Sequence, residues 1–154
     1  VPFRFLRITG DARTQLADAA QARLLQLEPE AGAAVIEKLR SRFTMPPLTI
    51  AVIARLGEDE KIPASERFSS AACVCFQLLL AAQAEGFGAQ WLTGWPAYDR
   101  PLLEQTLGLT ADEQLLGSIA IGTALVAVPE RERPDAAALL ADWTAHANHR
   151  FEHS

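Results

Sequence analysis

The sequence SSAACVCFQLLLAAQAEGFGAQWLTG, residues Ser69–Gly94, decides the fold of this chain, because it joins an apolar helix, a Gly-x-Gly break and a short strand. Between Ala71 and Ala84 only Gln77 and Gln83 are strongly polar, so no solvent-facing side recurs with a helical period. This pattern predicts a helix that is covered on every side, which a monomer of this size can scarcely achieve alone. The order of the three parts points to a buried ligand site, although the core helix of any α/β protein has a similar pattern.

Length and composition predict one compact globular domain over residues 1–154, with a flexible tail over 144–154. The chain has 154 residues, of which 49% are hydrophobic and 21% charged, enough for a real core. Its net charge of -5 argues against a broad phosphate-binding surface and therefore against nucleic acid as a partner. Small molecules and other protein chains fit this composition better.

The sequence predicts no membrane span. The longest nearly uninterrupted apolar run, Ala71–Ala82, is shorter than the ~20 residues that cross a bilayer. The chain opens on Val-Pro-Phe-Arg-Phe-Leu, without the charged segment, apolar segment and cleavage site of a signal peptide. We therefore expect a cytoplasmic protein.

The cysteines and histidines predict no metal site. Cys73 and Cys75 are two residues apart on the apolar helix, so they point in different directions and are expected to be buried free thiols. His146, His149 and His153 fall in the last nine residues, where a frayed tail is the more usual structure. A thiol redox protein that uses the two cysteines is the least favoured of the functions that the sequence allows.

Hydrophobic periodicity and turn residues predict four strands and five helices. The strand at Leu48–Ala54 is continuously apolar and rich in β-branched residues, as expected for a central strand covered on both faces. The other predicted strands are Phe3–Ile8, Gly88–Leu92 and Leu115–Ile121, and the predicted helices are Ala12–Leu27, Ala31–Phe43, the long apolar helix, Asp99–Leu107 and Asp135–Ala145.

The glycines Gly86 and Gly88 do not form a dinucleotide-binding fingerprint. That motif needs a strand before the glycines and a helix after them, and here the order is reversed. Gly86 is expected to end the helix in a left-handed conformation, and Gly88 to let the backbone turn closely into the following strand.

An ordered series of motifs along nearly the whole chain resembles the FMN-dependent nitroreductase family, in particular its small, single-domain NAD(P)H nitroreductases. No single motif is decisive, but the ordered set is. The matching residues are Pro2-Phe3-Arg4-Phe5, Lys61-Ile62-Pro63, Glu66, Ser70-Ala71-Ala72, Leu79-Leu80-Ala81-Ala82, Gly86-Phe87-Gly88, Trp91-Leu92-Thr93-Gly94, Leu107-Gly108-Leu109, Glu113, Gly117, Ile121-Gly122-Thr123 and the segment Pro129–Pro134.

The resemblance implies an α+β fold with a mixed sheet flanked by helices, in an intertwined homodimer with two FMN sites at the subunit interface. The long apolar helix would then lie in the dimer core, where the partner hides the side that a monomer would expose. The implied activity is that of an oxidoreductase. FMN takes a hydride from NAD(P)H at its N5 atom and passes the electrons to a small acceptor such as a nitroaromatic or a quinone.

By the same resemblance, Trp91, Leu92, Thr93 and Gly94 line the isoalloxazine ring. A backbone N–H near Thr93 or Gly94 is placed to bond N5, and Gly94 allows that close approach because it has no side chain. The alternative for Trp91 is an ordinary core aromatic. No residue of the chain is predicted to act as a dedicated catalytic acid or base.

Arg131 and Arg133 follow the last predicted strand, where the family often places an arginine that binds the FMN phosphate. A guanidinium matches a phosphate well in geometry and charge. A solvated run of charges with Glu130 and Glu132 explains these residues equally well, and both interpretations stay open.

The chain departs from the family pattern upstream of its first strand. Family members carry there an N-terminal helix with an Arg-Arg-Ser type motif that holds FMN, and in this branch a Pro-Asp-His-Gly-like turn. The chain begins after both, so either the polypeptide is incomplete or part of its FMN cradle is lost, and we favour the first. The alternative function is therefore a non-catalytic, flavin-free dimeric module that retains the fold.

Overall fold

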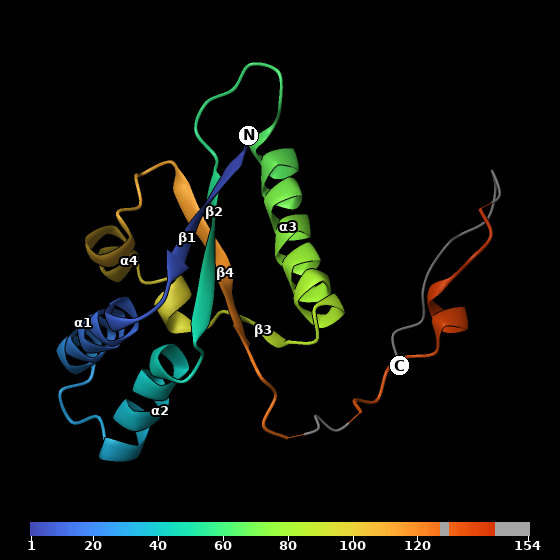
Figure 1. Cartoon of the computed structure of the whole chain (residues 1–154). Coiled ribbons are helices and arrows are strands. Elements are labelled where there is room, and N and C mark those ends of the chain that lie inside the picture. Colours follow the sequence, from blue (N-terminus) through green and yellow to red (C-terminus); the bar gives the residue numbers. More distant parts are fainter. Residues whose placement is uncertain (127–129, 144–154) are drawn as a thin grey trace. The chain divides into compact units, whose positions relative to one another are not determined.

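The computed structural model describes residues 1–126 and 130–143, and it separates into two units, residues 1–124 and residues from 125 onward. The first unit holds four strands, four α-helices and one short 3-10 helix (Figure 1). In chain order they are β1 (Phe3–Ile8), α1 (Asp11–Leu27), α2 (Ala33–Thr44), β2 (Leu48–Arg55), α3 (Ala64–Ala84), β3 (Gly88–Leu92), η1 (Trp95–Ala97), α4 (Arg100–Leu107) and β4 (Glu113–Gly122). The sequence thus predicted every strand and every α-helix of this unit to within a few residues, except the start of α3.

The four strands form one sheet in the order β1-β2-β4-β3, and every neighbouring pair is antiparallel. The α+β class is confirmed, but the expectation of a mixed sheet is wrong for these strands. The crossover through α3 does make β2 and β3 parallel to each other. They are not neighbours, however, because β4 lies between them and runs the opposite way, so these four strands form no parallel pair.

Helices cover both faces of the sheet, with α3 on one face and α1, α2 and α4 on the other (Figure 1). The alternation of β2 produces this arrangement, since successive side chains of a strand point to opposite faces. Val52 and Ala54 pack in the cluster with α3, whereas Ala51 and Ile53 pack toward Leu103 of α4. All four of these β2 residues are fully buried, as the sequence predicted for a central strand.

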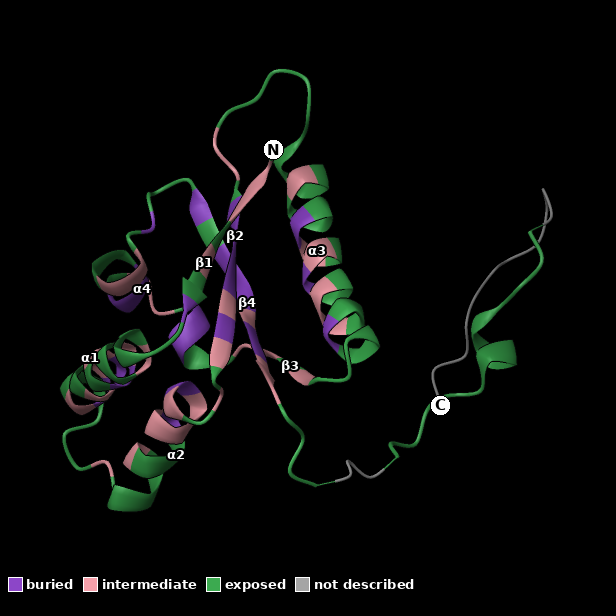
Figure 2. Cartoon of the chain, in the orientation of Figure 1, coloured by how far each residue is buried: buried purple, intermediate pink, exposed green. Residues whose placement is uncertain are grey.

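The long helix α3 is covered on one side only by the described residues of the first unit. Ala71, Cys75 and Ala82 are buried, whereas Phe76 and Leu80 are 56% and 49% exposed. Figure 2 shows buried, intermediate and exposed positions in turn along α3. The expectation of cover on every side is therefore not met within residues 1–124. An apolar pattern predicts that the surface of a helix is shielded from water, but it does not identify the chain that covers this surface.

Helix α3 also begins earlier than the apolar run suggested. Its 21 residues make it long and apolar enough to cross a bilayer by length and composition. The core helix of a protein without any membrane span passes the same test. Here α3 packs against the sheet through Ala71 and Cys75, so the finding is weak evidence for a membrane location.

The two cysteines differ in environment. Cys75 is buried against the sheet, and its burial raises the pKa of the thiol to about 11. Cys73 is exposed, which corrects the expectation that both are buried, because it lies on the uncovered side of α3. Both are free thiols.

The second unit contains only the short 3-10 helix η2 (Ala136–Leu139) in its described part. The predicted helix Asp135–Ala145 is therefore wrong up to Trp143, and its end lies outside the described residues, as do the three histidines and the tail 144–154. None of the residues of η2 is buried. A short helix without a packed face is marginal in water, even when it is rich in alanine.

Candidate cofactor site at the end of strand β3

Two glycines connect α3 to β3. Gly86 has a φ of 81°, which lets it end the helix in the left-handed region. Gly88 begins the strand opposite Gly122, and a Cβ built on it would lie 3.3 Å from Cβ of Ala124 and 3.4 Å from the carbonyl oxygen of Gly122. The close approach of two chain segments therefore explains Gly88, as the sequence suggested.

Trp91 anchors β3 to the core of the sheet on the α3 face. Its indole Nε1 donates a hydrogen bond to the backbone oxygen of Leu116 at 3.0 Å, and its ring packs beside Ile119. The ring occupies the space that a side chain at Gly117 would need, because a Cβ there would overlap the indole nitrogen. Trp91 is thus a core aromatic that holds the strand, whatever its backbone binds.

Leu92 lies toward the opposite face of the sheet, where it lines a groove beside α2. After it the chain turns through Thr93 and Gly94 into η1. Gly94 is exposed and has a φ of 87° and a ψ of -178°, a conformation that is essentially limited to glycine. A Cβ built on Gly94 would lie 3.2 Å from Nη1 of Arg42, so the guanidinium approaches the strand end closely.

Arg42 is a site residue that sequence reasoning missed. It is half-buried, and this burial lowers the pKa of its guanidinium. Across residues 1–126 and 130–143, no carboxylate lies within ion-pair distance of it and no hydrogen bond from its side chain is found. The sequence carried one signal of its role: Arg42 shares the buried side of its helix with Leu39 and Phe43, where a charge is unusual.

The groove beside Leu92 has a volume of about 510 Å³ and lies between α2 and strands β3 and β4. Among the described residues, the only charged ones that line it are Lys38 and Arg42, and both are basic. The rest of the lining is mostly apolar. It consists of Leu24, Val35, Leu39, Ser41, Met45, Pro46, Gln90, Leu92, Trp95 and Ala120.

Arg131 and Arg133, the predicted phosphate-binding residues, belong to the second unit. Arg133 forms an ion pair with Glu130 and donates a hydrogen bond to the carbonyl oxygen of Arg131 at 3.1 Å. Both side chains of that ion pair are largely exposed, as in a solvated run of charges. The first unit therefore places Leu92 and Gly94 beside Arg42, whereas the side chain of Trp91 lies on the opposite face of the sheet. The roles of Trp91, Thr93 and the two arginines of the second unit stay predictions.

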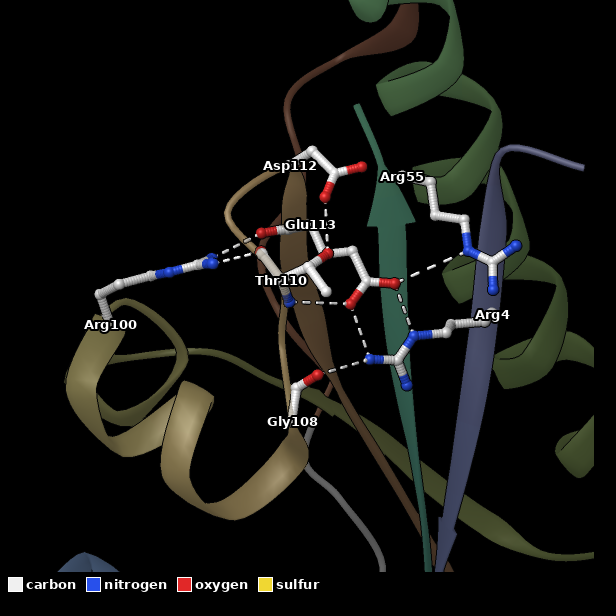
Figure 3. A network of polar contacts seen from close by, with 7 residues as sticks. All are labelled: Arg4, Arg55, Arg100, Gly108, Thr110, Asp112 and Glu113. Atoms are coloured by element: carbon white, nitrogen blue, oxygen red, sulfur yellow. Dashed lines mark hydrogen bonds and ion pairs between the residues drawn. The ribbon is translucent and has the colours of Figure 1, made fainter. Parts of the chain in front are cut away.

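A second polar cluster lies where β1, β2 and β4 meet (Figure 3). Glu113 accepts hydrogen bonds from Nε and Nη2 of Arg4 at 2.6 and 2.7 Å and from the backbone nitrogen of Thr110 at 3.2 Å, and Arg55 lies 3.6 Å away. The hydrogen bond from Arg4 is the main reason that the pKa of this carboxyl falls to about 2. The Glu113 carboxylate is therefore held inside the fold, where its pairing with Arg4 stabilises the sheet.

The part of the chain that the structure describes contains no group of three His, Cys, Asp or Glu side chains that could hold a metal ion. The candidate site therefore consists of the β3 end, the half-buried cation beside it and the groove along α2.

The chain is similar in sequence and in fold to known proteins. The chain is 28% identical over 122 residues to the Escherichia coli (strain K12) protein named "Putative NAD(P)H nitroreductase YdjA", an alignment that covers 79% of this chain and 65% of that protein. The chain thus spans slightly less than two thirds of the length of this relative.

Among solved structures, a nitroreductase-like family protein from Bacillus cereus superposes with a TM-score of 0.78 at 23% identity, over 92% of this chain and 73% of that one. The FMN-dependent nitroreductase NfnB from Mycobacterium smegmatis, solved in complex with NADPH, gives a TM-score of 0.60 at 16% identity, over 85% and 75% of the two chains. At these identities the likeness shows the fold alone.

A sequence model of the nitroreductase family matches residues 1–123, which is nearly the whole of the first unit. This match agrees with the ordered motifs, with the α+β fold and with the structural neighbours. The chain therefore belongs to the nitroreductase family.

Proposed function

We propose that this protein is an FMN-dependent oxidoreductase that uses NAD(P)H to reduce a small acceptor. The observation that carries the proposal is the half-buried guanidinium of Arg42 beside Gly94, at the end of β3. Membership of the nitroreductase family and the FMN and NADPH named for NfnB support it.

The residues at the end of β3 fit a flavin. Gly94 has no side chain that would obstruct a ligand, and Leu92 and Trp95 are among the apolar residues that line the adjoining groove. Arg42 supplies a positive charge for an electron-rich or anionic part of the cofactor. When bound, FMN would supply the redox centre, which accepts a hydride from NAD(P)H and passes electrons to the acceptor.

In this proposal the chain's own residues bind and orient the cofactor. The backbone N–H of Thr93 or Gly94 donates to the reactive edge of the ring, and Leu92 contacts it. Trp91 acts through the backbone, because its indole fixes β3 against β4 from the α3 face. Arg131 or Arg133 binds the phosphate through its guanidinium.

The proposed net reaction consumes one NAD(P)H and one proton for each two-electron reduction. A quinone is reduced to a hydroquinone while NAD(P)H is oxidised to NAD(P)⁺. A nitro group becomes a nitroso group, with the release of one water and NAD(P)⁺. No acidic or basic side chain of the site is assigned to the proton transfer.

We also propose that the protein is a cytoplasmic homodimer in which a second copy covers the exposed side of α3. Phe68, Phe76 and Leu80 on this helix are each more than 40% exposed in the single chain. Burial of these three side chains against another copy would remove a large apolar surface from water.

Titration of the chain with FMN, followed by quenching of flavin fluorescence, tests the proposal. We expect Arg42→Ala to weaken FMN binding at least about tenfold, since it removes a charge from a partly desolvated site. Arg40→Ala is the matched control, because Arg40 is on the same helix but pairs with Asp18 at the surface. It should leave the affinity within about twofold.

The same titration is repeated on a version extended through the native upstream codons. If neither form binds FMN, the oxidoreductase proposal fails and the flavin-free dimeric module replaces it. If both bind and both catalyse the oxidation of NAD(P)H by a quinone, the proposal holds.

A further inference from the structure

The groove along α2 has lining residues beyond Leu92, Trp95 and Arg42, which the proposed flavin site uses. Lys38 and Arg42 are four residues apart on α2, so they lie on one side of the helix, and both line the groove. Arg42 approaches Gly94, whereas Lys38 lies one turn, about 6 Å along the helix axis, farther from the strand end.

The charge of this groove is opposite to that of the whole chain. The chain has a net charge of -5, yet none of the described acidic residues lines the groove and both of its charged residues are cations. Lys38 is exposed, and the described side chains offer it neither an ion pair nor a hydrogen bond. Its ammonium group is therefore available to an anion that enters the groove.

The remaining lining suits a flat apolar ring. Val35, Leu39 and Met45 are apolar lining residues that the flavin proposal leaves unassigned, and the volume of about 510 Å³ lies in the usual range of small-molecule sites. The backbone positions of Lys38 and Arg42 are about one helical turn apart, a spacing on the scale of a substituted benzene ring. One substituent of such a ring could face Gly94 while another meets Lys38.

From this arrangement we infer that the electron acceptor is a nitro-substituted aromatic carboxylate, whose nitro group takes the electrons, and that Lys38 recognises its carboxylate. This inference rests on the proposed function. Arg42 is assigned to the cofactor, and Lys38 selects among acceptors. An ammonium hydrogen bond to a carboxylate favours such an acceptor over a neutral analogue of the same shape, which gains no ionic contact.

The test compares 4-nitrobenzoate with its neutral analogue 4-nitrobenzamide as acceptors for NAD(P)H oxidation. We expect Lys38→Gln to lower kcat/KM about tenfold for 4-nitrobenzoate, mainly through KM, and to change it less than twofold for 4-nitrobenzamide. Lys61→Gln is the matched control, because Lys61 is the only other lysine of the chain and lies outside the groove. It should change neither value.

A binding measurement separates this inference from the proposed function. Without NAD(P)H, binding of 4-nitrobenzoate is followed by quenching of tryptophan fluorescence, in the chain as purified and with FMN added. Binding that weakens about tenfold in Lys38→Gln supports the inference, even if the protein fails to oxidise NAD(P)H. If Lys38→Gln leaves this binding unchanged, or weakens the binding of the acid and the amide equally, the inference is overturned, even in a protein that reduces quinones.

Discussion

Arg4 and Arg42 show two opposite uses of a partly buried arginine in one small protein. Arg4 makes two short hydrogen bonds to Glu113, at 2.6 and 2.7 Å (Figure 3). Arg42 is more deeply desolvated, and among the residues that the structure places it has no such partner. Arg4 is paired inside the fold, whereas the guanidinium of Arg42 lies beside Gly94 without a counter-charge among those residues.

The presence or absence of a counter-charge distinguishes an arginine that stabilises the fold from one that we assign to ligand binding. A desolvated charge without a counter-charge costs free energy of folding, so a fold does not keep one for its own stability. A ligand that supplies negative charge or hydrogen-bond acceptors would offset that cost. The absence of a partner for Arg42 among the described residues therefore says more about function than the well-formed ion pair at Arg4.

The largest effect is expected at the paired arginine. Glu113→Gln leaves Arg4 without its counter-charge, and we expect the free energy of unfolding to fall by about 3 kcal/mol. This is the low end for a broken buried pair, because 23% of the Arg4 side chain stays exposed. Urea unfolding at a fixed protomer concentration measures the loss.

Glu104→Gln is the control for that variant. Glu104 pairs with Arg100 at the surface of α4, where half of the carboxylate side chain is exposed. Its loss should cost less than about 0.5 kcal/mol. Equal losses in the two variants would contradict the view that the Arg4 pair stabilises the sheet.

The second effect is the dependence of stability on pH. Glu113 has a folded pKa of about 2 and an ordinary value of 4.5, so its contribution is fully present above about pH 4.5 and is lost as the pH falls toward 2. Asp99, whose pKa is lowered mainly by its hydrogen bond from Arg23, changes stability in the same direction. We expect Glu113→Gln to flatten the acid limb of a plot of unfolding free energy against pH. An unchanged limb would mean that Glu113 is not responsible for it.

The third effect is expected at the strand end. Gly94→Ala places a Cβ in a conformation with positive φ and close to Arg42, so we expect it to cost about 1–2 kcal/mol of stability and to weaken FMN binding as well. Gly86→Ala is a matched variant, because Gly86 also has a positive φ but has no neighbour within 4 Å of the built Cβ. If both variants bind FMN like the parent chain, Gly94 is not near the cofactor.

The smallest effect is expected for the stability of Arg42→Met. Methionine keeps much of the aliphatic packing and removes the unpaired charge, so we expect the free energy of unfolding to stay unchanged or rise by up to about 1 kcal/mol. Urea unfolding without FMN measures the effect of Arg42→Met on stability. Urea unfolding with FMN measures its effect on the stabilisation by bound cofactor. A loss of more than about 2 kcal/mol without FMN would show that Arg42, like Arg4, stabilises the fold.

Most of the fold could be predicted from the sequence because its elements have strong local patterns. The alternation of Phe3–Ile8, the apolar run before Arg55 and the glycine after α4 each report local backbone geometry. The pairing of strands could not be predicted in the same way. That β4 lies between β2 and β3 depends on contacts between residues far apart in the chain, which periodicity does not encode.

The site shows the same limit. Trp91–Gly94 could be predicted as site residues because their residue types carry a family motif, although only the structure reveals that the indole of Trp91 is partly buried in the cluster with α3. Arg42 carries no motif and lies 52 residues before Gly94 in the sequence, so only folding brings the two together. The helix predicted for Asp135–Ala145 failed because composition alone cannot supply a packed face.

The position of β4 also governs the order in which the protein can fold. It is the last strand of the first unit to leave the ribosome, yet it pairs with both β2 and β3 in the middle of the sheet. Before β4 has been synthesised, the β1–β2 pair and the contacts of α1 with α2 and α4 and of α3 with β2 and β3 can form, but β2 and β3 lack the strand that joins them in the sheet. The sheet therefore closes only after nearly all of the first unit has been synthesised. Its many long-range pairings place it among topologies that fold more slowly than helical bundles.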